Sequence, residues 1–141
     1  MSEPLRVLIL CTANSARSQM AEGLLRHDGG ERFEVESAGT KPGIVRPEAI
    51  AVMKELGIDI SSHRSKHADE FAGVQFDYVI TVCDNAREAC PLYFGRAKRL
   101  HHGFADPALV TGSEVGRVAA FRDVRDELRA WLSTTFSLQI P

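Results

Sequence analysis

The sequence predicts a single α/β domain over residues 1–141, with a four-stranded parallel sheet flanked by helices on both faces. Three observations predict this class. Short apolar runs alternate with amphipathic stretches in the order β-α-β-α-β-(short helix)-β-α, which is typical of a parallel sheet covered by helices. The chain is long enough to bury a hydrophobic core and short enough for one domain. No repeat, low-complexity tract or linker interrupts it.

The spacing of apolar residues predicts the first three elements. Leu5–Leu10 is a nearly continuous apolar run with β-branched residues, which indicates a strand buried on both faces. Arg17–Asp28 is predicted to be a helix that ends at Gly29 and Gly30. Its apolar residues recur at helical spacing: Met20, Leu24 and Leu25. Phe33–Ser37 alternates apolar with acidic residues, as expected for a strand near a sheet edge.

Turn and strand signals continue in the middle of the chain. Pro47, followed by Glu48, predicts the first turn of a second helix, and Gly57 predicts its end. The inner face of that helix is expected to carry Ile50, Met53 and Leu56. Asp77–Val82 is rich in β-branched and aromatic residues and predicts a third strand. Ala97–Leu100 gives a weaker signal for a fourth strand.

The last predicted element is a long helix. Thr111 and Glu114 match a capping box at its start. The face expected to be buried carries Val118, Phe121, Val124, Leu128 and Trp131. Right-handed crossovers place the loops that follow parallel strands at one edge of the sheet. Cys11 and Cys83 each follow a predicted strand, so we expect both at that carboxyl edge.

Composition and charge exclude several classes of protein. The chain is 44% hydrophobic and 26% charged, with a net charge of −2, so nothing favours binding to nucleic acid or to an anionic membrane. The longest early apolar run, Val7 to Leu10, is too short to span a bilayer, and no secretory signal is visible. We therefore expect a cytoplasmic protein, and nothing in the sequence demands more than a monomer. Three cysteines in a reducing compartment do not suggest a structural disulfide framework.

The segment from Cys11 to Ser18 reads C-x5-R-S between a predicted strand and a predicted helix. A loop in that position turns backbone N–H groups inward at the positive end of the helix dipole, and this arrangement suits a tetrahedral oxyanion. Arg17 is expected to bind two oxygens of the anion. The anion-binding residues are predicted to be Thr12, Ala13, Asn14, Ser15, Ala16, Arg17 and Ser18. The alternative is a Cys that points into the core, with a solvated Arg downstream.

The same loop is expected to activate Cys11. An unperturbed thiol, with a pKa of about 8.5, is only roughly 3% ionised at pH 7, and helix N-termini and nearby cations lower that pKa. We therefore expect Cys11 to be a thiolate nucleophile. Ser18 is a candidate hydrogen-bond donor to it, and the Asn14 amide is a candidate for holding the loop in shape.

Asp106-Pro107 lies just before the last predicted helix and is expected to reach the same edge. A carboxylic acid there can protonate the oxygen that leaves the central atom, as a general acid. The alternative is an ordinary turn, because Asp-Pro is a frequent turn-starting pair.

Cys83 and Cys90 lie seven residues apart. On a helix that spacing is about 10.5 Å, whereas a disulfide needs Cα atoms within about 7 Å. The pair can therefore bond only if the intervening helical turn unwinds. Capping by Asp84 or Asn85 and the stop at Pro91 leave a helix too short to be stable alone.

These three thiols suggest a relay. In this hypothesis Cys11 attacks an oxyanion, Cys83 attacks Cys11, and Cys90 attacks Cys83. A phosphatase needs no such relay, because water can resolve its covalent intermediate, but arsenic(V) can accept two electrons. A metal site is disfavoured because paired C-x2-C spacing is missing; its ligands would be Cys83, Cys90, His101 and His102. We therefore predict no metal.

The chain resembles the thioredoxin-coupled arsenate reductases built on the low-molecular-weight tyrosine phosphatase scaffold. The resemblance rests on CTANSARSQMAEG, ESAGT, DISSH, VCDNAREACP and GFADPALVTGSE, which occupy Cys11–Gly23, Glu36–Thr40, Asp59–His63, Val82–Pro91 and Gly103–Glu114. It implies that Cys11 is the nucleophile, Arg17 the oxyanion clamp and Asp106 the general acid. It also implies that Cys83 and Cys90 are the resolving pair. Arsenate would be the substrate, with weak side phosphatase activity, no tightly bound cofactor, and thioredoxin as the external thiol reductant.

Three positions depart from the pattern of these relatives. Ala16 replaces a cysteine found in many of them, which should make the loop less prone to inactivating oxidation. His101-His102 stands where they usually have a tryptophan. Some relatives bind potassium behind the loop through residues that match Asn14, Glu22 and Ser37 together with an aspartate. Lys66 stands in the place of that aspartate, so we expect no potassium requirement.

Two other functions stay open at this stage. A low-molecular-weight tyrosine phosphatase would use the same Cys11, Arg17 and Asp106, although only Tyr93 and Phe94 are nearby candidates to hold a phenyl ring. A non-catalytic oxyanion sensor would bind arsenate and signal by closing a disulfide. The reductant is also open, because the cysteine spacing does not distinguish thioredoxin from a low-molecular-weight thiol.

Overall fold

The computed structural model describes residues 3–83 and 96–140. Its elements are β1 (Leu5–Cys11), α1 (Arg17–Gly29), η1 (Gly30–Arg32), β2 (Phe33–Gly39), α2 (Pro47–Lys54), η2 (Ala68–Phe71), β3 (Tyr78–Thr81), β4 (Lys98–His101), η4 (Pro107–Leu109) and α4 (Glu114–Phe136). The short helix expected between the third and fourth strands, with Cys90, lies outside the described residues.

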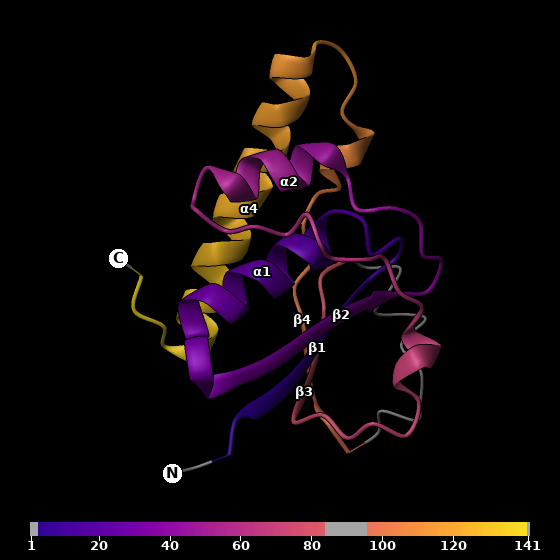
Figure 1. Cartoon of the computed structure of the whole chain (residues 1–141), viewed down its shortest axis with the longest axis vertical. Helices are drawn as coiled ribbons and strands as arrows, with labels where there is room; N and C mark the ends of the chain where they lie inside the picture. The colour runs from indigo at the N-terminus through magenta and orange to yellow at the C-terminus, as the bar shows by residue number, and fades with distance from the viewer. Residues whose placement is uncertain (1–2, 84–95, 141) are drawn as a thin grey trace.

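The four strands form one parallel sheet in the order β2-β1-β3-β4. This confirms the predicted fold class. Figure 1 shows α1 and α4 side by side on one side of the strands and η2 on the other. β2 is an edge strand, as its alternating pattern predicts, and it continues two residues beyond the expected end, to Gly39.

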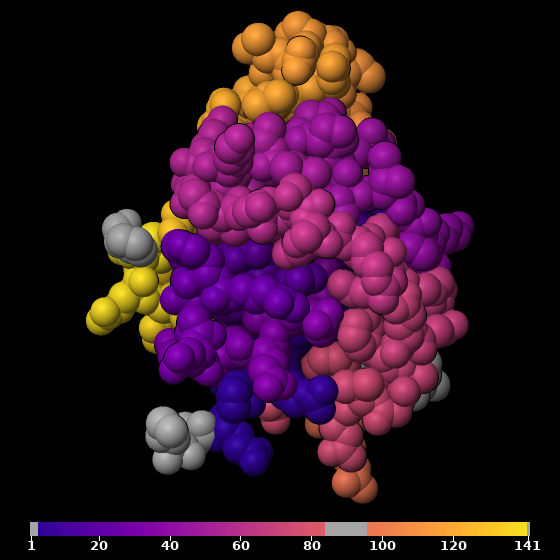
Figure 2. Space-filling view, in the orientation of Figure 1, coloured from indigo at the N-terminus to yellow at the C-terminus, as the bar shows by residue number. Residues whose placement is uncertain are grey.

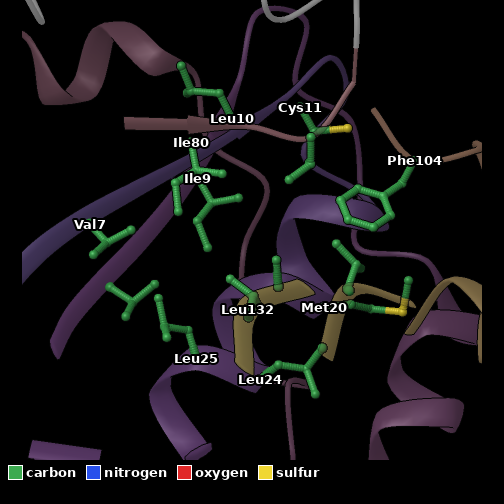
Figure 3. Packing of buried hydrophobic residues seen from close by; sticks show 14 of the residues in the cluster. Val7, Ile9, Leu10, Cys11, Met20, Leu24, Leu25, Ile80, Phe104 and Leu132 are labelled. Carbon is green, nitrogen blue, oxygen red and sulfur yellow. The ribbon is translucent and has the colours of Figure 1, made fainter. Parts of the chain in front are cut away.

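β1 lies at the centre of the molecule because both of its edges are paired and both of its faces are covered. Its residues from Val7 to Leu10 have no exposed surface. Figure 3 shows the core where this strand meets β3, α1 and α4, with Leu24 and Leu25 of α1 facing Leu132 of α4. A strand buried this completely is a rigid support for the loop that begins at Cys11.

α4 begins differently from the capping-box prediction, which was wrong. Ser113 is the N-cap, and its hydroxyl accepts a hydrogen bond from the Gly116 N–H. Gly112, at φ 110°, turns the chain between Thr111 and Ser113, and this leaves Glu114 as the first helical residue. The Ser113 side chain caps the helix by itself, so the reciprocal glutamate of a capping box is not needed.

The buried face of α4 was predicted in part. Phe121, Val124 and Leu128 are buried, whereas Val118 and Trp131 are only half-buried. The face also includes residues that the prediction missed: Arg125, Leu132 and Phe136. The first turns of α4 have few buried side chains because the start of this helix projects beyond α2, as Figures 1 and 2 show.

α2 starts at Pro47 as predicted, and Gly57, at φ 76°, follows its end. Its buried residues are Ala49, Val52 and Met53, so the expected inner positions Ile50 and Leu56 are only half-buried. None of the described helices is long and apolar enough to cross a membrane.

Candidate functional site

Three chain segments meet at the carboxyl edge of the sheet. Cys11 is the last residue of β1, Cys83 follows β3, and Asp106 follows β4 just before η4. All three strands run in the same direction, so their ends lie together, and the structure places these side chains around one loop, residues 11–18. Cys90, which was also expected in the site, lies outside the described residues.

The backbone of the loop is held with its carbonyl oxygens pointing outward. Segment 41–46 donates three N–H groups to the loop, from Lys41 to Thr12, Gly43 to Ala13 and Arg46 to Ser15, at 2.9, 3.1 and 2.9 Å. The Asn14 carbonyl accepts from the Gln19 amide, and the Ala16 carbonyl accepts from the Met20 N–H. With the carbonyls of residues 12–16 bound outside, the loop N–H groups are directed toward its centre, as an anion nest requires.

Asn14 fixes the sharpest point of this loop. It adopts the left-handed conformation, with φ 49°, and is completely buried. Its amide nitrogen donates to the Ser18 and Ser37 hydroxyls at 2.8 and 2.9 Å. Its amide oxygen accepts from the Lys66 backbone N–H and from Gln19, both at 2.9 Å. Four hydrogen bonds to one side chain offset the cost of a left-handed residue that is not glycine.

Gly39 supports the loop. It belongs to the ESAGT motif, but the sequence alone did not identify it as a site residue. A Cβ at this position would lie 2.4 Å from the Thr12 carbonyl oxygen and 2.9 Å from the Asn14 nitrogen. Only glycine lets the end of β2 approach the loop backbone this closely. The sequence signal was a glycine at the end of a strand, which often marks a close backbone approach.

Arg17 is held at the mouth of the loop by the segment that carries Asp106. Its guanidinium donates to the Phe104 carbonyl at 2.9 Å and lies 3.4 Å from the Asp106 carboxylate. Its Nε is buried and has no hydrogen-bond partner within the described part of the chain. A buried N–H donor without a partner beside an anion nest fits an oxyanion that would complete its hydrogen bonding.

The pocket formed by these groups has a volume of about 270 Å³. Its lining includes Cys11, Arg17, Asp106 and the exposed Leu109. A larger hollow of about 650 Å³ lies near Arg6 and Asp77, at the opposite end of the sheet, but neither of the two described cysteines lines it. We therefore identify the smaller pocket as the candidate active site.

The two carboxylate oxygens of Asp106 have different partners. One oxygen accepts a hydrogen bond from the Ala108 N–H at 3.0 Å and caps η4, which is the turn that its Asp-Pro sequence suggested. The other faces Arg17. The turn and the site are therefore not alternatives, because the turn aims the carboxyl group at the pocket.

Cys11 and Cys83 are both buried and lie against each other. The hydrogen bond with Cys83 raises the pKa of Cys11, and burial adds to this effect, whereas Arg17 and the Thr12 N–H oppose it. The expected thiolate is therefore not favoured in this arrangement. The two thiols compete for one negative charge, so ionisation of one keeps the other protonated. The Cys83 sulfur also lies 3.3 Å from the Thr12 hydroxyl.

A buried ionic cluster lies behind the loop. The Ser37 hydroxyl donates to the Glu22 carboxylate at 2.6 Å. The Lys66 ammonium lies 3.8 Å from Glu22 and 3.5 Å from Glu36, and its side chain is 10% exposed. A protein cation therefore sits beside the buried Glu22 carboxylate. His63 also faces Glu22, at 3.6 Å, and burial lowers its pKa.

His101, the last residue of β4, and His102, which follows it, have other partners. His101 contacts the Thr81 hydroxyl at 2.7 Å, and His102 stacks on the Phe104 ring. Over residues 3–83 and 96–140, no three His, Cys, Asp or Glu side chains gather in a way that could hold a metal ion.

The comparison with protein families agrees with this geometry. Residues 6–137 match the family described as low molecular weight phosphotyrosine protein phosphatase. This match covers nearly the whole chain, so the protein belongs to that family.

Relatives within the family are more specific. The chain is 41% identical over 128 residues to an arsenate reductase of Halalkalibacterium halodurans, covering 91% of this chain and 92% of the relative. The fold of this chain matches that of an arsenate reductase solved in a phosphate-binding state, with a TM-score of 0.81 and 30% identity. The match covers 94% of this chain and 97% of the other. This chain also matches a thioredoxin-dependent arsenate reductase of Corynebacterium glutamicum, with a TM-score of 0.68, 29% identity, and coverage of 97% of this chain and 65% of the other.

Proposed function

We propose that this protein reduces arsenate to arsenite with the thiols of Cys11 and Cys83. The observation that carries the proposal is a second buried thiol, Cys83, which is hydrogen-bonded to the nucleophile Cys11 and lies 3.3 Å from the Thr12 hydroxyl of the oxyanion loop. A phosphatase of the same family needs only one cysteine, because water resolves its intermediate. The arsenate reductase of Halalkalibacterium halodurans, at 41% identity, supports the same assignment.

The first step is attack on the oxyanion. Arsenate binds in the nest of loop N–H groups, and the Arg17 guanidinium binds its oxygens. The Cys11 thiolate attacks arsenic and forms a sulfur–arsenic bond. One arsenate oxygen leaves as water after it takes a proton from Asp106, which the turn at η4 aims into the pocket. Because Cys83 raises the pKa of Cys11, this step starts from a minor thiolate fraction that Arg17 favours.

The second step is the reduction. The Cys83 thiolate attacks the Cys11 sulfur, so that a disulfide forms and the electron pair of the sulfur–arsenic bond passes to arsenic. Arsenic gains two electrons and leaves as arsenite, and the two cysteines lose two. The contact between the two buried thiols means that this attack needs little movement.

The third step moves the disulfide away from the pocket. Cys90 attacks the Cys83 sulfur, which forms a Cys83–Cys90 disulfide and returns Cys11 as a thiolate. The helix that the sequence predicts between these two cysteines would have to unwind before they can bond. An external dithiol then reduces the disulfide, and the thioredoxin-dependent relative favours thioredoxin for this role.

A steady-state assay with thioredoxin, thioredoxin reductase and NADPH tests the proposal. Wild type should consume arsenate over many turnovers, whereas Cys83→Ser and Cys90→Ser should lose multiple turnover. His27→Ala gives a control, because it changes an exposed residue at the far end of α1, outside the relay and the pocket, and should keep the thioredoxin-dependent turnover. Full activity in both cysteine variants would rule out the relay. Arsenate binding by wild type without turnover would instead favour an oxyanion sensor.

The pocket also supports weak phosphatase activity, because phosphate and arsenate share shape and charge. This activity would use Cys11, Arg17 and Asp106 but not Cys83. We expect slow hydrolysis of p-nitrophenyl phosphate by wild type, and an equal or higher rate for Cys83→Ser, because loss of the Cys83 thiol should lower the pKa of Cys11. A phosphatase rate far above the arsenate turnover would reverse the order of the two functions.

A further inference from the structure

Three aromatic side chains gather where the segment that contacts Arg17 meets α4. The His102 ring lies parallel to the Phe104 ring, with centroids 4.3 Å apart and an angle of 29°. The Trp131 ring of α4 lies 5.7 Å from His102 and 6.2 Å from Phe104. We call these three residues the aromatic stack. Phe104 is buried and His102 is exposed, so His102 forms the outer layer over the Phe104 ring.

The backbone of the stack is tied to the end of β3. The His102 N–H donates to the Thr81 carbonyl at 3.1 Å, and the Phe104 N–H donates to the Val82 carbonyl at 3.0 Å. The N–H side of Phe104 is therefore held by the sheet. Figure 3 shows the Phe104 ring at the end of the core where Cys11 lies.

The carbonyl side of Phe104 faces the active site. It accepts the hydrogen bond from Arg17 at 2.9 Å, two residues before Asp106, which holds the same guanidinium. Both described polar contacts of this guanidinium therefore come from residues 104–106. The Phe104 ring is clamped between the core and His102, and this limits rotation about the backbone bonds that set the direction of its carbonyl.

We propose that His102 and Trp131 are positioning residues for Arg17. They act through Phe104, whose packed ring keeps its carbonyl where it orients the guanidinium toward the loop. Neither residue needs to touch the substrate. This inference rests on the proposed function for its substrate, but it concerns the binding of any tetrahedral oxyanion in the pocket.

The test measures oxyanion affinity separately from turnover. Inorganic phosphate is titrated by calorimetry into the fully reduced protein for wild type, His102→Ala and His102→Trp. Because His102→Ala removes the ring that is stacked on Phe104, we expect it to weaken phosphate binding about threefold to tenfold. His102→Trp restores a ring over Phe104 and should bind phosphate within about twofold of wild type. In arsenate turnover, His102→Ala should raise KM by a similar factor and change kcat less.

Controls separate positioning from a general loss of structure. His27→Ala removes another exposed histidine, which pairs with Asp28 at the far end of α1, and should leave phosphate binding unchanged. His102→Ala should melt within a few degrees of His27→Ala, since the side chain lost is exposed. Trp131→Leu keeps an apolar group on α4 but loses the ring, and should weaken phosphate binding in the same direction as His102→Ala.

Unchanged phosphate affinity in both His102→Ala and Trp131→Leu would overturn the inference. Equal weakening by His102→Ala and His102→Trp would also overturn it, because the ring would then not matter. Failure of the proposed function would give a different result, because wild type would bind phosphate but release no arsenite. The phosphate affinities of the variants would still test the role of the aromatic stack.

Discussion

The Thr12 hydroxyl oxygen lies 3.3 Å from the Cys83 sulfur, so a direct hydrogen bond joins the oxyanion loop to the second cysteine. Thr12 belongs to the loop that binds the anion, and Cys83 belongs to the step that removes the product. A hydroxyl in this position can donate to the Cys83 sulfur when that sulfur is a thiolate. The loop thus contributes to both chemical steps of the proposed reaction.

This contact predicts the behaviour of two variants. Thr12→Val keeps the shape of the side chain but removes the hydrogen bond, so the attack of Cys83 should slow by about tenfold or more. Thr12→Ser keeps the hydroxyl and should retain most of the rate. Rapid-quench measurement of arsenite release in a single turnover reports this step. Phosphatase activity serves as the control, because it does not use Cys83, and an equal loss there would assign the effect to the loop.

The pKa of Cys11 predicts a second effect of Cys83. The hydrogen bond with Cys83 raises the pKa of Cys11, so its removal in Cys83→Ala should lower that pKa. The rate of Cys11 alkylation by iodoacetamide, followed by mass spectrometry of the Cys11 peptide, should therefore rise at lower pH in Cys83→Ala than in wild type. Identical pH profiles would show that Cys83 has no electrostatic influence on the nucleophile.

Asp106 should affect the step in which an arsenate oxygen leaves as water, rather than the binding of the oxyanion. Asp106→Asn keeps an oxygen that can accept from the Ala108 N–H and cap η4, but it cannot donate a proton as a carboxylic acid does. We expect kcat for arsenate to fall about 100-fold, the low end of the range for general acid catalysis. Phosphate affinity measured by calorimetry should stay within severalfold of wild type. A kcat close to that of wild type would remove Asp106 from the mechanism.

Gly39 should tolerate no side chain. Gly39→Ala would place a methyl group 2.4 Å from the Thr12 carbonyl oxygen, so the loop or β2 must shift. Overpacking of this kind costs about 1–3 kcal/mol, and we expect a Tm lower by several degrees together with weak phosphate binding. Gly43→Ala is the matched control, because a Cβ there has no atom within 4 Å. Similar melting curves for the two variants would contradict the close approach of strand and loop.

Lys66 should make the enzyme independent of potassium. Its ammonium lies beside the buried Glu22 carboxylate, which accepts from Ser37 behind the loop. Replacing sodium by potassium should therefore leave the arsenate turnover of wild type unchanged. Lys66→Met leaves Glu22 with Arg26, at 3.2 Å, as its close cation and should lower the Tm, since the buried carboxylate would lose one of its two described ion pairs with permanently charged residues. Activity of wild type that rises severalfold with potassium, but not with sodium, would contradict this role.

Patterns that depend on neighbours along the chain predicted the fold well. The apolar run in β1 and the loop between β1 and α1 were both visible in the sequence, because strand and helix periodicities are local. The prediction for the start of α4 was wrong. Thr111 matched a capping pattern, but the turn at Gly112 makes Ser113 the N-cap. Thr111 and Ser113 both have hydroxyls that can cap a helix, and the sequence alone did not show how the turn at Gly112 would direct the chain.

The site was predicted as separate pieces rather than as an arrangement. The sequence pointed to Cys11, Cys83 and Asp106 at one edge, but it could not reveal that Cys83 lies against Cys11 and raises its pKa. That effect depends on how the segment after β3 packs on the loop. The closeness of Gly39 to Thr12 is likewise a contact between residues distant in sequence.

Disulfide mapping after a single turnover tests the central claim most directly. Reduced Cys90→Ser is mixed with one equivalent of arsenate, alkylated, digested and analysed by mass spectrometry, while released arsenite is counted. The proposed reaction predicts about one arsenite per protein and a trapped disulfide between Cys11 and Cys83. Arsenite release that leaves both cysteines alkylated as free thiols, or no arsenite at all, would contradict it.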